Sequence, residues 1–205
     1  MVEAQISFVV VGHCSRRHQA ERLAQMLNAH LLIDEDKHGA NWNHRRAIEW
    51  ASQQDSRVVI LEDDALPVPG FAQKVAEWLS RFPDDLLSFY LGTGRPPQYQ
   101  LEIATKLIDT DRQQADYIIL NRLIHGVCYS VPQPKLDQVI SRWNHGSPAD
   151  YAVGDACGGA VVYPCYSLVD HAYATTVERH PDNTPRTERR RAWRLDAATN
   201  PESVP

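Results

Sequence analysis

Short apolar runs and helical apolar patterns alternate along the first half of the chain. Apolar runs at residues 6–12, 31–34, 58–61 and 86–91 predict buried strands of the kind found in parallel sheets. Between them, apolar residues recur every three or four positions, which predicts helices over residues 20–27, 44–54 and 71–82. The opening order of strand, helix and strand favours a parallel pair joined by a right-handed crossover.

The second half of the chain has a less regular pattern. We expect a helix near residues 100–115, strands at 117–120 and 124–131, a helix face over 136–143 and a last apolar strand over 160–169. The whole pattern predicts an α/β fold, a single Rossmann-like domain with a mixed, mostly parallel central sheet flanked by helices. This domain is expected to occupy residues 1–180. Residues 181–205 form an Arg- and Pro-rich tail whose composition indicates a loosely held segment.

Composition and charge exclude some classes of function. The chain has 205 residues, 43% of them hydrophobic, and its net charge of −5 argues against binding nucleic acid through overall charge. No apolar stretch approaches the roughly 20 residues that span a bilayer, and the start lacks the basic region of a signal peptide. We therefore expect a cytoplasmic protein without a membrane partner. Its cysteines show no metal-binding spacing and are expected to be mostly buried free thiols: Cys14, Cys128, Cys157 and Cys165.

Three adjacent carboxylates follow the apolar run at residues 58–61. Glu62, Asp63 and Asp64 come directly after it, and a Pro/Gly turn follows at 67–70. Ligands of open α/β sheets bind outside the carboxyl ends of the strands, and three neighbouring acids repel one another unless a cation or water relieves them. The pattern therefore predicts a site for Mg²⁺ or Mn²⁺, ions that usually carry substrate phosphates. The alternative is a solvated acidic loop.

Four segments of the chain are distinctive in their order. The first, residues 38–50, contains a glycine, a histidine and a closing tryptophan, and it precedes the acidic motif at 61–71. The third, residues 123–131, contains the apolar sequence Gly-Val-Cys-Tyr-Ser-Val, and the fourth is Ser-Leu-Val-Asp-His at 167–171.

In these segments and their order, the chain resembles GT-A-fold glycosyltransferases, above all the lipooligosaccharide family that includes the collagen galactosyltransferases. It is also similar to small phage-encoded glycosyltransferases, for which the expected location is the host cytoplasm. His44 keeps the histidine of the family's first segment and is placed among the donor-binding residues. The chain departs from the family at Asn43, where a serine is usual, and at Asp170, where the family has glutamine.

The resemblance implies a metal-dependent transfer of a sugar from a nucleotide-sugar donor, with a UDP-sugar as the expected donor, to an acceptor hydroxyl. In the family pattern the last acid of the motif binds the metal, which maps to Asp64. Glu62 and Asp63 are then expected to hold the nucleoside sugar or metal-bound water. His171 is the expected third ligand of Mn²⁺ or Mg²⁺, with His180 as the alternative.

The ends of the first two strands are expected to meet the nucleotide. Val11 and Gly12 end the first strand, and a glycine there allows close approach of a ligand to the backbone. Arg16 or Arg17 could pair with a phosphate through two hydrogen bonds, whereas at least one of them is expected on a solvated helix start. Asp34, at the end of the second strand, could accept a hydrogen bond from a ribose hydroxyl or the uracil edge.

An inverting transfer needs a general base for the acceptor hydroxyl, and two aspartates are candidates. Asp155 lies between Gly154 and a Cys-Gly-Gly turn, which suits an exposed reactive position, and Asp150 follows a polar loop. A turn-capping role is equally compatible with either residue, and a retaining transfer would not need the base.

Two other classes of function stay open at this stage. One is a non-catalytic glycan- or nucleotide-binding module, and the other is a nucleotidyltransferase, for which the loop at residues 13–17 is a poor triphosphate site. The acceptor could be a protein, a glycan or modified DNA. Five arginines and Trp193 within residues 186–194 could hold a phosphate backbone with a stacked base. The alternatives are a solvated tail or a segment that closes over the donor diphosphate.

Overall fold

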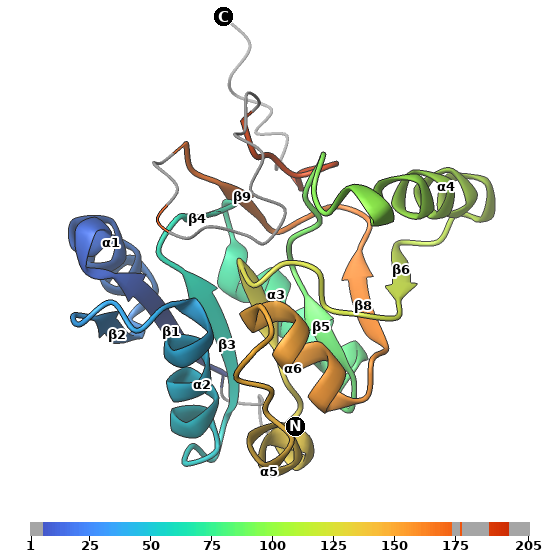
Figure 1. The fold of residues 1–205 in the computed structure, drawn as a ribbon. Coiled ribbons are helices and arrows are strands. Elements are labelled where there is room, and N and C mark those ends of the chain that lie inside the picture. The colour runs from blue at the N-terminus through green and yellow to red at the C-terminus, as the bar shows by residue number, and fades with distance from the viewer. Residues whose placement is uncertain (1–5, 174–176, 178–188, 197–205) are drawn as a thin grey trace, which may run out of the picture.

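A seven-stranded sheet forms the centre of the protein (Figure 1). The computed structural model describes residues 6–173, 177 and 189–196. In spatial order the strands are β2 (His30–Asp34), β1 (Ile6–His13), β3 (Arg57–Glu62), β7 (Cys128–Ser130), β5 (Leu86–Ser88), β8 (Val161–Pro164) and β6 (Tyr117–Leu120). β7 and β6 run opposite to the others. The prediction of a mixed, mostly parallel central sheet flanked by helices is therefore confirmed.

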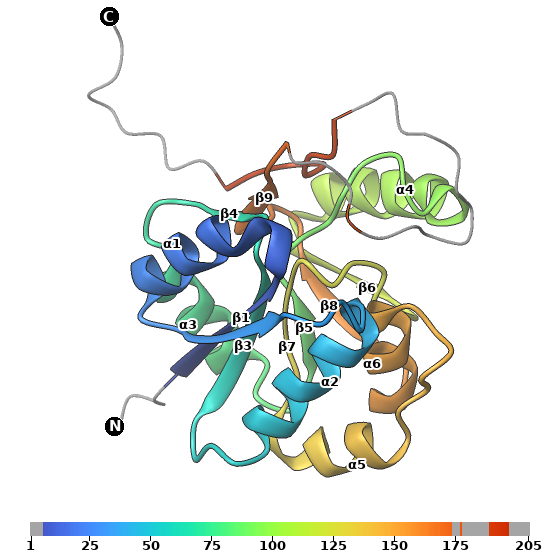
Figure 2. The same ribbon diagram turned by 60° about the vertical axis from the view of Figure 1, so that its left-hand side comes forward.

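Helices cover both faces of the sheet (Figure 2). One face carries α1 (Arg17–Leu27) and α3 (Phe71–Arg81), and the other carries α2 (Ala40–Ala51), α5 (Leu136–Ser141) and α6 (Ala149–Cys157), while α4 (Pro97–Gln113) packs beside β6. Successive strand residues point to opposite faces, so in β3 Val59 and Leu61 pack toward α1 and α3, whereas Val58 and Ile60 pack toward α2.

Among the described residues, no helix is long and apolar enough to cross a bilayer.

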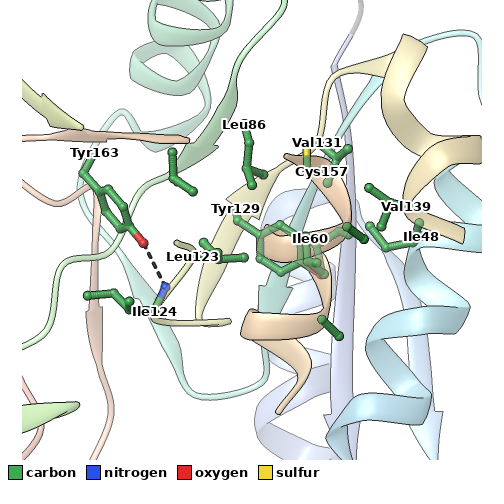
Figure 3. Close-up of a cluster of buried hydrophobic side chains, with 14 of the residues drawn as sticks. Ile48, Ile60, Leu86, Leu123, Ile124, Tyr129, Val131, Val139, Cys157 and Tyr163 are labelled. Carbon is green, nitrogen blue, oxygen red and sulfur yellow. Dashed lines mark hydrogen bonds between the residues drawn. The ribbon is translucent and has the colours of Figure 1, made fainter. Parts of the chain in front are cut away.

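The core between the sheet and α2, α5 and α6 contains two buried tyrosines with satisfied hydroxyl groups (Figure 3). The Tyr163 hydroxyl accepts a hydrogen bond from the Ile124 amide at 3.0 Å and donates one to the Arg122 carbonyl at 3.2 Å. Tyr129 lies within 3.0 Å of the His44 ring. Because an unpaired buried hydroxyl is costly, these bonds fix the chain near residue 124 and a histidine of α2 from inside the core.

A small second sheet joins the acidic motif to a distant part of the chain. β4 (Ala65–Pro67) follows the acids directly and pairs antiparallel with β9 (Val169–His171). The register places Ala65 opposite His171. The amide of Ala172 also donates to the Asp64 carbonyl at 2.8 Å. The pairing of β4 with β9 therefore places His171 next to the acidic turn.

Residues 189–196 pack on the domain, so the expectation of a loosely held tail is wrong for this part of residues 181–205. The Trp193 amide donates to the Leu91 carbonyl, and the Ser167 amide donates to the Arg194 carbonyl, each at 2.8 Å. Backbone groups of Leu91, after β5, and of Ser167, before β9, therefore form hydrogen bonds with this segment. Composition alone does not reveal this pairing. His180 and Arg186 lie outside the described residues.

Several predicted elements differ from the structure in their extent; the strand expected over 160–169, for example, is regular only over Val161–Pro164. The strand expected at 86–91 ends at Ser88, because the chain beyond it bonds to residues 167–168 as well as to Cys128. The strand expected at 124–131 is regular only over 128–130. The second helix begins at residue 40 instead of 44.

Gly154 lies where α6 packs closely against Leu123. A Cβ atom at Gly154 would lie 2.7 Å from the Leu123 amide nitrogen and 2.9 Å from the Leu123 Cβ. Although alanine is favoured over glycine in helices by about 1 kcal/mol, this clash should dominate. We expect Gly154→Ala to lower the free energy of unfolding by about 1–3 kcal/mol, measured by urea denaturation.

Gly146→Ala is the matched control, because the nearest atom to its added Cβ would be Asn144 Oδ1 at 3.5 Å. Its free energy of unfolding should stay within about 0.5 kcal/mol of wild type. A Gly154→Ala variant as stable as the control would contradict the tight contact between α6 and residue 123.

Candidate functional site

A cavity of 1020 Å³ lies at the carboxyl edge of the central sheet. It is bounded by the ends of β1 and β3, by residues 124–127, and by the first turns of three helices, α2, α4 and α6. Its charged and ring-bearing lining residues are Glu62, Asp150, Lys37, Arg95, Arg190, His13, His125, His145, His171, Tyr90 and Tyr151. This position is the one at which open α/β sheets bind their ligands.

Parallel register brings the predicted strand-end residues to the same edge. His13 at the end of β1 is paired with Asp34 of β2, and Val11 is paired with Glu62 of β3. The His13 amide donates to Asp63 Oδ2 at 2.8 Å, which ties the end of β1 to the turn after β3. The acidic turn is therefore held by the neighbouring strand as well as by its own.

Glu62 is the acid of the motif that lines the cavity. His44 lies behind it, 1% exposed, with Nε2 3.4 Å from Glu62 Oε1 and Nδ1 3.0 Å from the Tyr129 hydroxyl. Burial alone would raise the pKa of Glu62, but the charges and hydrogen bond of His44, with His171 and Arg190, lower it. Glu62 therefore carries a negative charge. His44 does not line the cavity; it positions Glu62 from the α2 side.

Gly126 lies close to Glu62 and His44. A Cβ atom at this position would lie 2.7 Å from Glu62 Oε1 and 3.2 Å from His44 Cε1. A side chain at this position would therefore require the Glu62 carboxylate to shift. The segment that was predicted as a strand instead lines the cavity next to Glu62.

Asp63 and Asp64 are buried beneath Arg16 and do not line the cavity. Arg16 Nη2 lies 2.9 Å from Asp63 Oδ1, and Arg16 Nη1 forms a short hydrogen bond with Asp64 Oδ2. Burial, with the nearby charges of Asp64 and Glu62, raises the pKa of Asp63 to about 7, against the opposing effects of Arg16 and the His13 amide. Asp63 thus joins the strand ends together and does not line the cavity in which a donor is expected to bind.

The Nε2 atom of His171 faces the Asp64 carboxylate. Its Nε2 lies 3.4 Å from Asp64 Oδ2, and its Nδ1 lies 2.7 Å from the Ala172 carbonyl. Nε2 thus faces the Asp64 carboxylate, whereas Nδ1 faces a carbonyl acceptor. The Arg190 guanidinium donates to Nε2 at 3.0 Å.

Asp64 and His171 are the side chains that would hold a divalent cation here, in place of their present contacts with Arg16 and Arg190. Asp64 Oδ1 is a buried oxygen that has no hydrogen-bond partner among the described residues, and His171 Nε2 is nearby. No group of three or more His, Cys, Asp or Glu side chains in residues 6–173 and 189–196 has metal-binding geometry. Two ligands are sufficient for Mg²⁺ or Mn²⁺ sites that take their other ligands from substrate phosphate and water.

Asp150 lies in the first turn of α6 and lines the cavity, with 9% of its surface exposed. One of its oxygens accepts a hydrogen bond from the Tyr151 amide at 2.9 Å. Burial, reinforced by the charge of Glu62, raises the pKa of Asp150 to about 7, against the opposing effects of the Tyr151 amide and His44. A carboxyl group with this pKa is suited to accept a proton near neutral pH.

Asp155 is exposed, as expected, but it lies within a helix and away from the cavity. α6 continues through Gly154 to Cys157, and Gly158, with φ of 113°, ends it. Asp155 therefore lies on the solvent side of the helix, where it makes two hydrogen bonds of 2.8 Å with Arg122. It does not line the cavity.

Val11 and Gly12, near the end of β1, do not line the cavity. Val11 is buried in the core between the sheet and α2. A Cβ atom at Gly12 would lie 2.7 Å from Ala20 Cβ and 2.8 Å from Ile33 Cδ1. The glycine is therefore required by the packing of α1 against the sheet, whereas the sequence suggested close approach of a ligand.

Arg17 and Asp34 have structural partners instead of a position in the cavity. Arg17 is exposed on α1 and pairs with Glu35. Asp34 is buried and accepts hydrogen bonds from the His38 amide at 3.0 Å and the Gly39 amide at 2.8 Å, which shapes the loop before α2. As the sequence suggested for one of the two arginines, Arg17 lies on a solvated helix start.

Arg190 lines the cavity, although no specific role was expected for it from the sequence. It was noted only as part of an arginine-rich segment, yet it contacts His171. Of its neighbours, Arg194 pairs with Asp111 through two bonds of 2.7 Å, and the Trp193 ring nitrogen donates to Gln100 at 3.1 Å. These two side chains are engaged within the protein, which weakens the case for a nucleic-acid patch.

No family model matches the chain, and no curated protein matches it. Among solved structures, the fold is similar to that of A197 from STIV, with a TM-score of 0.55. The similarity covers 94% of this chain and 96% of that chain at 11% sequence identity. At this identity the comparison shows the shared α/β fold and leaves the function to be argued from the site.

The raised pKa of Asp150 predicts a pH-dependent stability. Between pH 4 and 7 the folded protein keeps a proton on Asp150 that the unfolded chain releases near the ordinary pKa of 3.8. The contribution of this group to the free energy of unfolding therefore falls as pH rises through this window. We expect the stability of Asp150→Asn relative to wild type to increase from pH 4 to pH 7 and to be constant above it.

Urea denaturation at constant ionic strength, repeated across this pH range, measures the difference. Asp155→Asn is the control on the same helix and should not reproduce the increase. A difference between Asp150→Asn and wild type that does not change with pH would show that Asp150 is not protonated in the folded protein near neutral pH.

Proposed function

We propose that the protein is a glycosyltransferase that moves a sugar from a nucleotide-sugar donor of the UDP class to an acceptor hydroxyl, assisted by Mn²⁺ or Mg²⁺. One observation carries this proposal. A single cavity combines an acidic strand end, with His171 and Arg190 beside it, and a buried carboxyl group, Asp150, whose pKa is about 7. The first set suits the departure of a diphosphate, and the second suits activation of an acceptor.

The cavity favours an anionic substrate. The N-caps of α2, α4 and α6 are Gly39, Pro96 and Pro148, and none of them supplies a side-chain hydrogen bond to its helix. The positive ends of three helix dipoles therefore border the cavity. Lys37 and Arg190 add positive charge to the lining. A diphosphate is the part of a nucleotide sugar that these groups would bind.

In this proposal Asp64 and His171 hold the divalent cation, which when bound neutralises charge that develops on the leaving phosphate oxygen. Arg190 donates to His171 in the structure and is placed to donate to a phosphate oxygen in the same part of the cavity. Glu62, kept ionised by His44, is placed to accept hydrogen bonds from sugar or ribose hydroxyls.

Asp150 is the proposed general base. As the bond between the anomeric carbon and the diphosphate oxygen breaks, its electron pair leaves with the diphosphate. The acceptor oxygen forms the new bond to the anomeric carbon, and its proton moves to the Asp150 carboxylate. This assignment applies to an inverting transfer and replaces the earlier candidate Asp155.

A non-catalytic binding module is the second candidate, because Arg16 already pairs with both Asp63 and Asp64, where a metal ion would bind. Such a module would bind the nucleotide sugar without turnover. A nucleotidyltransferase would instead release pyrophosphate from a nucleoside triphosphate. The acceptor, whether a protein, a glycan or modified DNA, is left open by this proposal.

We place the reaction in the cytoplasm, the host cytoplasm for a phage-encoded protein. The four cysteines are free, and Cys128, Cys157 and Cys165 are buried, as the sequence predicted. Free buried thiols are common in a reducing compartment.

Asp64→Asn should abolish metal-dependent turnover of the donor. Hydrolysis of a panel of UDP-hexoses with Mn²⁺ is followed by release of UDP, and kcat should fall by at least about 100-fold, the order of loss seen when one charge-stabilising group is removed. Asp116→Asn, an exposed acid paired with Arg81, is the control and should keep wild-type activity. Full activity of Asp64→Asn would contradict the site, and binding of UDP-hexose without turnover by wild type would favour the binding module.

Asp150→Asn should reduce turnover without weakening donor binding. With water or an added acceptor, kcat/KM of wild type should rise with pH up to about 7, following ionisation of Asp150. The variant should lose this rise and keep the Kd for UDP. Asp155→Asn is the matched variant on the same helix and should behave as wild type. The opposite result for the two variants would move the base to Asp155.

A further inference from the structure

Arg16 occupies the position between the two buried acids of the motif. Its side chain is 17% exposed, whereas the side chains of Asp63 and Asp64 are 2% and 3% exposed. One terminal nitrogen contacts Asp63 and the other contacts Asp64. The guanidinium therefore supplies the positive charge that two buried neighbouring carboxylates require.

A divalent cation and Arg16 need the same oxygens. Asp64 Oδ2 accepts the hydrogen bond from Arg16 and also lies 3.4 Å from His171 Nε2, the second atom of the proposed metal pair. A metal ion bound between Asp64 and His171 would stand within a few ångströms of the guanidinium. Two cations at this separation repel strongly in a poorly solvated site.

The way in which Arg16 is held allows it to leave. It contacts the acids only through its two terminal nitrogens, and its Nε atom has no hydrogen-bond partner among the described residues. It lies at the end of the short 3-10 helix Cys14–Arg16, directly before α1, so rotation of its side chain disturbs no backbone hydrogen bond of the sheet.

Asp64 keeps one oxygen available for an incoming ion. Its Oδ1 atom is buried and has no hydrogen-bond partner within the described part of the chain. An unpaired buried carboxylate oxygen is unfavourable unless a cation can reach it. It is therefore a place where a metal ion could start to bind while Arg16 still holds Oδ2.

We propose that Arg16 is an internal counter-cation that competes with the divalent metal for Asp64, so that metal binding and release of the guanidinium are coupled. This inference rests on the proposed function, because it takes Asp64 as a metal ligand. Without the metal, Arg16 is the cation that contacts both Asp63 and Asp64. With the metal, the guanidinium is displaced from Asp64.

The test is a direct titration of the protein with Mn²⁺, followed by electron paramagnetic resonance of the free ion, without any donor. Arg16→Met removes the competing charge and should bind Mn²⁺ at least about 10-fold more tightly than wild type. Arg17→Met is the matched control, because Arg17 is the next residue and pairs with Glu35 on the surface. Its Mn²⁺ affinity should equal that of wild type.

Two further variants keep the test decisive. Arg16→Lys retains the charge but cannot bridge both acids, so its Mn²⁺ affinity should lie between those of wild type and Arg16→Met, and it serves if Arg16→Met fails to fold. Asp64→Asn in the Arg16→Met background should lose the bound ion. Retained Mn²⁺ binding in that double variant would place the metal elsewhere and overturn the inference.

The outcomes separate this inference from the proposed function. Equal Mn²⁺ affinity of wild type and Arg16→Met would overturn the competition while leaving the metal site in place. Weaker binding by Arg16→Met would overturn it too, by showing that Arg16 supports the ion. Absence of Mn²⁺ binding in every variant would remove the metal from the proposed function, and the inference with it.

Discussion

The burial of the acidic turn at the end of β3 is the constraint on which the rest of the site depends. Carboxylates that leave water must gain cations or hydrogen-bond donors, or they destabilise the fold. Here the partners come from Arg16 after β1, His44 in α2 and His171 in β9. Because these residues belong to three distant parts of the sequence, the acidic turn ties the first half of the chain to its C-terminal segments.

The C-terminal segments contribute His171 and Arg190 to the site. β9 pairs with β4 directly after the acids, and residues 189–196 add further backbone bonds beside Leu91 and Ser167. Through this pairing Arg190 reaches His171 at the edge of the cavity. The cavity is thus built from strand ends that the sheet aligns and from a late segment that covers them. Its mixture of positive and negative groups is suited to a substrate with a charged leaving group.

The apolar runs were sufficient to predict the sheet and most of the helices, because burial on both faces leaves a continuous apolar pattern in the sequence. The prediction failed where another constraint decided the local structure. The strand expected at 124–131 is regular only over 128–130, and Gly126 lies close to Glu62 in the segment before it. No element was predicted for residues 151–157, which form most of α6, where Gly154 packs against Leu123. Both glycines serve tertiary contacts that no local pattern reports.

The sequence by itself determined the α/β architecture and the acidic strand end, because both follow from the order of apolar and charged residues along one stretch of chain. Only the tertiary structure decided which candidates share the cavity. It kept Glu62, Asp150 and His171 at the lining, turned Asp155 outward, and added Arg190. Side-chain direction and the partners of buried charges depend on residues far away in the sequence, so no local pattern contains them.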